Sequence, residues 1–106
     1  MLVLPVLTGD RVINLPAVAP GLFYRFVVAD PIALAFNAVI TPPVNALCNG
    51  TLIETNAGAG ISLPVAAENT VTFNAVAIAG DYMNVVCDGT RWLIEGISSV
   101  QGFTVP

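Results

Sequence analysis

The sequence contains no histidine and no lysine, and these two absences remove most of the common enzyme chemistries. Without histidine, no Ser–His or Cys–His pair is available to activate a nucleophile, and no metal site with a histidine ligand is possible. Without lysine there is no residue for a Schiff base or a P-loop, and neither glycine-rich stretch fits a phosphate-binding pattern. We therefore expect that the protein is not an enzyme and has no catalytic residue, no cofactor and no metal ligand.

Charge is scarce as well, since charged residues make up 9% of the chain and the net charge is −4. Soluble domains usually carry about 25% charged residues. The three arginines, Arg11, Arg25 and Arg91, are scattered, so direct binding to nucleic acid, which needs basic groups to neutralise phosphates, is not expected. The seven acidic residues are also dispersed, which argues against a calcium site or a paired-carboxylate glycosidase site.

Three of the acidic residues lie beside glycines at predicted turns, namely Asp10, Asp81 and Asp88. An aspartate at such a position normally accepts hydrogen bonds from neighbouring backbone N–H groups. We therefore expect a structural role for all three.

Cysteine is too sparse for a disulfide scaffold, because the chain has only Cys48 and Cys87. Both lie among apolar neighbours, so we expect buried free thiols. Asn49-Gly50-Thr51 is formally a glycosylation sequon. In a chain with no secretion signal, its Asn-Gly pair is better interpreted as a hairpin turn.

Long hydrophobic runs are also missing. The most apolar stretch, residues 16–40, is broken by two prolines and two charged residues, so it does not provide the ~20 apolar residues of a membrane-spanning helix. The first residues, MLVLPVLTGDR, have no basic region, and Pro5 interrupts their apolar run, so a signal peptide is not expected. The sequence therefore predicts a soluble or assembled protein that is made without secretion.

Apolar residues are abundant instead, at 56% of the 106 residues. Such an excess indicates that part of the apolar surface is covered by other chains. An ordinary Val/Ala-rich β-core with an apolar exterior remains as the alternative.

Strand-like runs rich in Val, Ile, Leu, Phe and Thr recur about every ten residues between turn-forming residues, and no segment has a clear helical period. The runs predicted as strands are 11–15, 22–29, 32–40, 51–54, 60–63, 70–78, 82–87 and 90–95, with an extended segment at 101–105. This pattern predicts an all-β fold, a small antiparallel β-sandwich or jelly-roll-like barrel of about eight short strands. Residues 1–106 are expected to form a single domain, with 1–10 as an N-terminal arm and 97–106 as a C-terminal extended segment.

The clearest local feature is a hairpin over residues 82–95, in which Asp88-Gly89 is predicted as a two-residue type I′ turn. The predicted pairs are Cys87 with Thr90, Val85 with Trp92, and Met83 with Ile94. One face then contains Met83, Val85, Cys87, Trp92 and Ile94, and the other contains Tyr82, Asn84, Val86, Arg91, Leu93 and Glu95. The first face is predicted to be core, as is Phe26. Val86 and Leu93 on the second, more polar face suggest contact with a neighbouring molecule there.

Two segments resemble a β-module of structural proteins in tailed phages and other large DNA viruses, where it occurs in tail-fibre ends and head-surface proteins. The opening segment is Ile13-Asn14-Leu15-Pro16 followed by Gly21-Leu22-Phe23-Tyr24-Arg25-Phe26-Val27-Val28. The closing segment contains Ala79-Gly80-Asp81-Tyr82 and then Asp88-Gly89-Thr90-Arg91-Trp92-Leu93-Ile94-Glu95-Gly96. Together they frame residues 13–96, although 31–70 and the last ten residues do not match.

The resemblance implies a trimeric β-structure on a virion and brings no catalytic residue with it. Since the chain begins almost directly with the module, a head-decoration (cement) protein on the capsid surface is expected, made in the host cytoplasm. Its partners would be the major capsid protein and itself, with no membrane or nucleic acid. A carbohydrate-binding tail-fibre tip and a non-viral accessory domain of an enzyme remain as alternatives, and no binding surface can be assigned.

Overall fold

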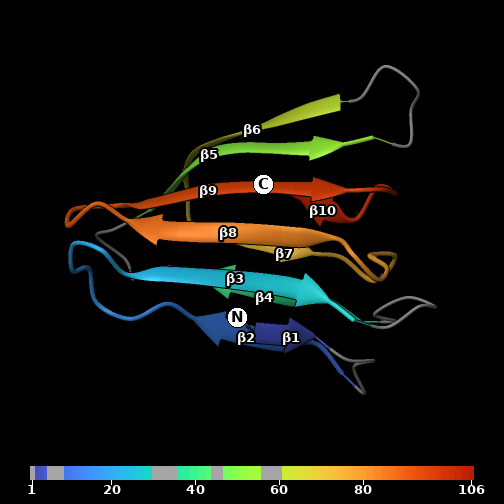
Figure 1. Cartoon of the computed structure of the whole chain (residues 1–106), viewed down its shortest axis with the longest axis horizontal. Helices are drawn as coiled ribbons and strands as arrows, with labels where there is room; N and C mark the ends of the chain where they lie inside the picture. The colour runs from blue at the N-terminus through green and yellow to red at the C-terminus, as the bar shows by residue number, and fades with distance from the viewer. Residues whose placement is uncertain (1, 5–8, 30–35, 44–46, 56–60) are drawn as a thin grey trace.

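The computed structural model describes residues 2–4, 9–29, 36–43, 47–55 and 61–106. These residues contain ten strands in two sheets and no helix (Figure 1). The six-stranded sheet has the order β1 (Leu2–Leu4), β3 (Phe23–Val28), β8 (Tyr82–Cys87), β9 (Trp92–Ser98), β5 (Cys48–Glu54) and β6 (Ile61–Glu68). The four-stranded sheet has the order β10 (Phe103–Thr104), β7 (Val71–Phe73), β4 (Ala38–Thr41) and β2 (Arg11–Asn14). The predicted all-β sandwich is confirmed.

The sheets are mixed rather than purely antiparallel. The pairs β1–β3, β2–β4 and β5–β9 are parallel, and the remaining pairs are antiparallel. Parallel neighbours cannot be joined by a tight turn and need a longer crossover. Here the chain provides the crossovers by alternating between the two sheets from β1 to β5 and again around β7.

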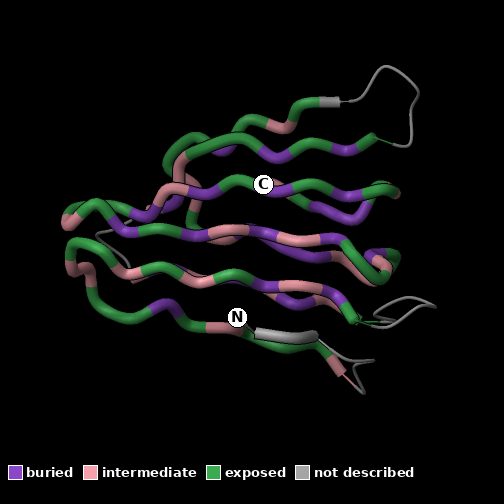
Figure 2. Tube along the Cα trace, in the orientation of Figure 1, coloured by how far each residue is buried: buried purple, intermediate pink, exposed green. Residues whose placement is uncertain are grey.

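Alternation along the strands divides the six-stranded sheet into a buried and an outer face, which Figure 2 shows as alternating colours. The buried side chains of both sheets meet in a single core. The largest of them are Trp92, Phe26 and Phe73, each at most 1% exposed. The Trp92 ring packs against Tyr24 with 6.0 Å between ring centroids. The predicted core positions of Trp92 and Phe26 are therefore confirmed.

The two cysteines lie on either side of Trp92 in one cross-strand row. Trp92 on β9 pairs with Cys87 of β8 on one side and with Cys48 of β5 on the other. The cysteines are thus two strand spacings apart, about 9–10 Å, whereas a disulfide needs Cα atoms within about 7 Å. Both are buried and free, as predicted. Burial raises the pKa of Cys48 to about 11.

The β8–β9 hairpin forms, but its predicted register was wrong by two residues. Cys87 pairs with Trp92 and Val85 with Ile94, so the connection is a four-residue loop rather than a two-residue turn. Only Gly89 has a positive φ in this loop, whereas a type I′ turn needs two such residues. The Asp88 carboxylate accepts from the backbone N–H groups of Thr90 and Arg91 instead, which closes the wider loop. Because a shift of two residues preserves side-chain direction, the predicted faces of the two strands are correct.

Asn49-Gly50 was predicted as a turn and is instead part of β5. Gly50 has a φ of +146° at an irregularity in the β5–β6 pairing. A Cβ at this position would collide with the backbone carbonyl of Ile94. Glycine is thus required by close approach of β9 and not by a reversal of the chain.

Several predicted strand bounds also change. The strand predicted at 70–78 covers only Val71–Phe73, because Asn74 and the following residues form a turn in which the Asn74 side chain accepts from the Val76 N–H. β5, β6 and β9 extend beyond the predicted 51–54, 60–63 and 90–95. The predicted N-terminal arm contains β1, and the predicted C-terminal segment contains the end of β9 and all of β10. Residues 32–35 and 60 of the predicted strands lie outside the described residues.

Candidate functional site

The outer face of the six-stranded sheet carries most of the exposed large hydrophobic side chains among the described residues. We define it by the outward residues of four adjacent strands, which are Phe23, Arg25 and Val27 on β3, Tyr82, Asn84 and Val86 on β8, Leu93, Glu95 and Ile97 on β9, and Asn49, Thr51 and Ile53 on β5. None of these twelve residues belongs to the core between the sheets. The face therefore presents the same four strands that form the core on their other side.

Strand register arranges these side chains in three rows that cross the sheet. The first row is Phe23, Val86, Leu93 and Asn49. The second row is Arg25, Asn84, Glu95 and Thr51. The third row is Val27, Tyr82, Ile97 and Ile53. A polar row thus lies between two largely apolar rows.

The apolar rows are open to solvent. Phe23 is 58% exposed, and Val86, Ile97 and Ile53 are each 38–39% exposed. They are four of the seven exposed large hydrophobic side chains among the described residues. Isolated exposed aliphatics are common, but a cluster on one sheet face is typical of an interaction site.

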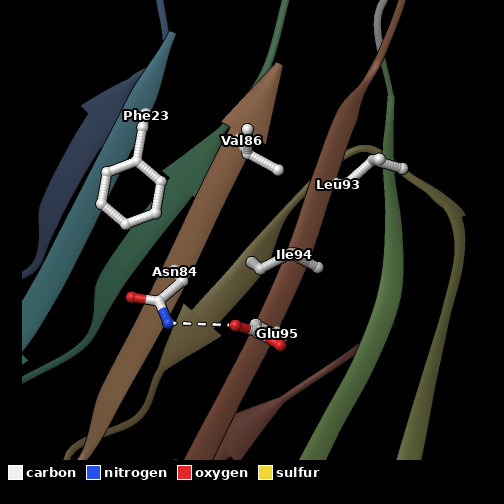
Figure 3. Close-up of a pocket in the computed structure, with 6 residues that line it drawn as sticks. All are labelled: Phe23, Asn84, Val86, Leu93, Ile94 and Glu95. Carbon is white, nitrogen blue, oxygen red and sulfur yellow. Dashed lines mark hydrogen bonds between the residues drawn. The ribbon is translucent and has the colours of Figure 1, made fainter. Parts of the chain in front are cut away.

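The central row contains one cation and one anion on opposite sides of Asn84. The Asn84 Nδ2 donates to Glu95 Oε1 over 3.1 Å (Figure 3). The Arg25 guanidinium lies 4.5 Å from the centre of the Tyr82 ring, close enough for a cation–π interaction. Since β8 lies between Arg25 and Glu95, they form no ion pair, and the ion pair found in the described part of the chain joins Arg91 and Asp88.

Two shallow hollows interrupt this face. One of about 290 Å³ is lined by Phe23, Asn84, Val86, Leu93, Ile94 and Glu95 (Figure 3). The other, of about 400 Å³, is lined by Thr51, Ile53, Tyr82, Ile94, Glu95, Gly96 and Ile97. The Asn84 Oδ1 beside the first hollow is shielded from solvent and has no hydrogen-bond partner among the described residues. Both hollows lie open on the outer face and are large enough to receive side chains of a partner or part of a small ligand.

A second group of polar residues is buried at one end of the sandwich. The Asp81 carboxylate accepts from the Ile78 N–H, from the Ser98 hydroxyl and from both the N–H and the hydroxyl of Ser99. The Ser98 oxygen also accepts from the Gly102 N–H. Glu54, only 5% exposed, accepts from the Phe103 N–H. These bonds tie the end of β9 to the loops before β8 and β10, so the group is structural.

The other two aspartates singled out from the sequence also bond the backbone. Hydrogen bonds from the Thr90 and Arg91 N–H groups hold the pKa of Asp88 well below its usual range. The Asp10 carboxylate accepts from the Asn37 N–H, which is 27 residues away. The predicted bonds to neighbouring backbone N–H groups are confirmed for Asp88 and, through Ile78, for Asp81. Asp10 instead accepts from a distant N–H, and Asp81 also bonds Ser98 and Ser99, contacts that sequence spacing did not indicate.

Within residues 9–29, 36–43, 47–55 and 61–106, no group of three or more acidic or thiol side chains converges to hold a metal ion. The described residues also contain no helix long and apolar enough to cross a membrane.

Only part of the outer face was predicted from the sequence. Val86 and Leu93 were singled out because they are apolar residues on the polar face of the predicted hairpin. Phe23 and Ile53 were not, because their place on this face depends on the pairing of β3 and β5 with distant strands. Ile97 was missed because β9 was predicted to end two residues before it.

Comparison with protein-family models, with curated proteins and with solved structures gave no match for this chain.

Proposed function

We propose that the protein is a structural component of a virus particle, a head-decoration (cement) protein that binds the assembled shell and stabilises it. The observation that carries this proposal is the outer face, where exposed Phe23, Val86, Ile97 and Ile53 surround a single polar row. We infer that this face is covered by protein in the particle. The resemblance of residues 13–96 to virion β-modules supports the choice of a virus particle as the setting.

The physical basis of the stabilisation is linkage. A protein that binds the assembled shell but not its separated subunits shifts the equilibrium towards the shell. Burying valine, isoleucine and phenylalanine costs little desolvation, and the twelve residues of the outer face include no lysine. Contacts of this kind are only weakly screened by salt.

The proposal is tested with particles that contain or lack the protein, heated at low and at high salt. Particles with the protein are expected to survive to higher temperature at both salt concentrations. The double variant Phe23→Ser, Ile97→Ser is expected to be lost from the particle. Val76→Ser is the matched control, because Val76 is 53% exposed but lies in the loop after β7, away from the outer face. Equal survival of particles with and without the protein would overturn the proposal.

A second candidate is a receptor-binding tip of a tail fibre that recognises carbohydrate. The first hollow favours it, because an exposed aromatic ring, Phe23, lies there beside the amide of Asn84 and the carboxylate of Glu95 (Figure 3). A ring that stacks on a sugar and polar groups that bond its hydroxyls are the usual parts of such a site. A glycan array separates the two candidates. A fibre tip is expected to bind a glycan and to lose that signal in the Phe23→Ala variant, whereas a decoration protein is expected to give no such signal.

A further inference from the structure

We propose that two copies of this chain pair through their outer faces. The two-fold axis lies midway between the facing six-stranded sheets of the two copies and runs parallel to β8. The proposal rests on the proposed function in one respect, that the outer face is the assembly surface, and it names a second copy as the occupant of that surface. The partner protein of the shell is then bound by the remaining surface of the pair, and outer-face variants are lost from the particle because one copy attaches more weakly than two linked copies.

The charges of the central row select this axis. Arg25 lies one strand to one side of β8, and Glu95 lies one strand to the other side. Rotation about an axis along β8 exchanges the two sides, so Arg25 of each copy faces Glu95 of the other. An axis across the strands leaves each side in place and puts Arg25 opposite Arg25 and Glu95 opposite Glu95. The first arrangement forms two ion pairs, and the second brings like charges together at an apolar interface, which is costly.

The apolar residues agree with the same axis. Rotation along β8 leaves the order of the rows unchanged, so each row faces its own counterpart. Phe23 then faces Leu93 of the other copy, and Val27 faces Ile97. Val86 and Tyr82, both on β8, lie on the axis and meet their own counterparts. Apolar groups therefore contact apolar groups over β3, β8 and β9 in the first and third rows, and Asn84 meets its own counterpart in the central row.

The geometry is that of ordinary sheet packing. Two sheets usually pack face to face about 10 Å apart, with their strands at about 30° to each other. A two-fold axis tilted about 15° from β8 gives this crossing angle, because the rotation doubles the tilt. Arg25 and Glu95 flank the central strand, so this rotation moves them little out of register. Arg25 already lies over the Tyr82 ring, and each Arg25 then reaches the opposite Glu95 beside an aromatic surface.

The size of the shared face sets the strength of the pair. With β8 on the axis, β3, β8 and β9 overlap, and β5 of each copy lies opposite the three-residue β1 of the other. The shared face is then at most about 24 Å wide and about 17 Å long at the usual strand and residue spacings. The projected area is at most about 400 Å² per copy, about 800 Å² in total, which is below the ~1,000 Å² of a stable specific interface and in the range of weak, transient ones. We therefore expect a reversible pair whose population rises with concentration.

The test is a charge exchange followed by sedimentation velocity over a range of concentrations. The unmodified chain is expected to shift from 11.0 kDa towards twice that mass. Arg25→Glu and Glu95→Arg should each weaken pairing at least tenfold, because each creates two like-charge contacts. The double variant Arg25→Glu, Glu95→Arg, and an equimolar mixture of the two single variants, should both regain it. Arg11→Glu is the control for Arg25→Glu, since it changes the net charge by the same amount but lies on β2 of the other sheet.

Recovery in the mixture also excludes misfolding of the single variants as the cause of their loss. A chain that stays at 11.0 kDa at every concentration, a trimer mass as expected from the family resemblance, or pairing unaffected by the single charge reversals would each overturn the two-fold pair. The proposed function is judged separately by particle survival. If the chain is monomeric and still protects particles, only the proposed pair is contradicted. If the chain pairs but gives no protection, only the proposed decoration function is contradicted.

Discussion

The two faces of the six-stranded sheet are built from the same strands but differ in what their side chains do. On β8 and β9, the inward residues Met83, Val85, Trp92 and Ile94 are at most 3% exposed and pack against the second sheet. The outward neighbours Val86 and Ile97 remain 38–39% exposed. Because alternate residues lie on opposite faces, substitutions within this one hairpin can change the buried face or the outer face separately.

The largest effect is expected from the centre of the buried face. Trp92→Ala should lower the free energy of unfolding by about 3–5 kcal/mol, the usual cost of truncating a fully buried large aromatic side chain. Val86→Ala, on the outward face of the same hairpin, should cost less than about 1 kcal/mol. Denaturant titration of both variants checks the comparison. A loss below about 1 kcal/mol for Trp92→Ala would show that Trp92 does not support the core.

The next largest effect is expected from a substitution that tests how closely β8 and β9 pack against each other. Gly96 has no room for a methyl group, because a Cβ there would collide with the Tyr82 carbonyl and lie 3.0 Å from Leu52. Gly96→Ala should therefore destabilise the fold by about 1–3 kcal/mol. Gly9→Ala is the control, since a Cβ at Gly9 has nothing within 4 Å and should change thermal stability little. Equal melting temperatures of the two variants would contradict the close packing.

A similar effect is expected at the buried polar end of the sandwich. Asp81→Asn places an NH₂ group among donors that now bond a carboxylate, and should cost about 2 kcal/mol through unpaired polar groups. Asp10→Asn should be nearly neutral, because the amide oxygen can still accept from the exposed Asn37 N–H. Chemical denaturation followed by Trp92 fluorescence measures both. A neutral Asp81→Asn would mean that the Asp81 network does not stabilise the loops.

The smallest effect is a pH dependence from Cys48. Burial raises the pKa of Cys48 from its ordinary 9.0 to about 11. Between these values the unfolded chain loses this proton and the folded chain keeps it, so the free energy of unfolding falls as the pH rises. Cys48→Ala should flatten the fall relative to the unmodified chain.

The thiols themselves can be counted without reducing agent. Two thiols per chain should react in denaturant and react only slowly in the native state, and fewer than two would contradict the free-thiol assignment.

The sequence predicted what depends on short-range alternation and missed what depends on distant pairing. The faces of β8 and β9 were correct because side-chain direction repeats every two residues, and the error of two in register left them intact. Gly50 was misassigned because its requirement arises from Ile94, a residue far along the chain. The parallel pairs were not predicted because each depends on a crossover between the sheets. For the same reason, the sequence placed the outer-face residues Tyr82, Asn84, Val86, Leu93 and Glu95 of the hairpin on one face, but not those of β3 and β5.

The most direct test of the contrast between the two faces is hydroxyl-radical footprinting of the chain, free at high dilution and bound in the particle. Oxidation of Phe23 and Ile97 should fall strongly in the particle, while oxidation of the exposed loop residue Val76 should stay unchanged. Trp92 should be protected in both states. Equal oxidation of Phe23 and Ile97 in the free and bound states would contradict the account, because the outer face would then remain uncovered on assembly.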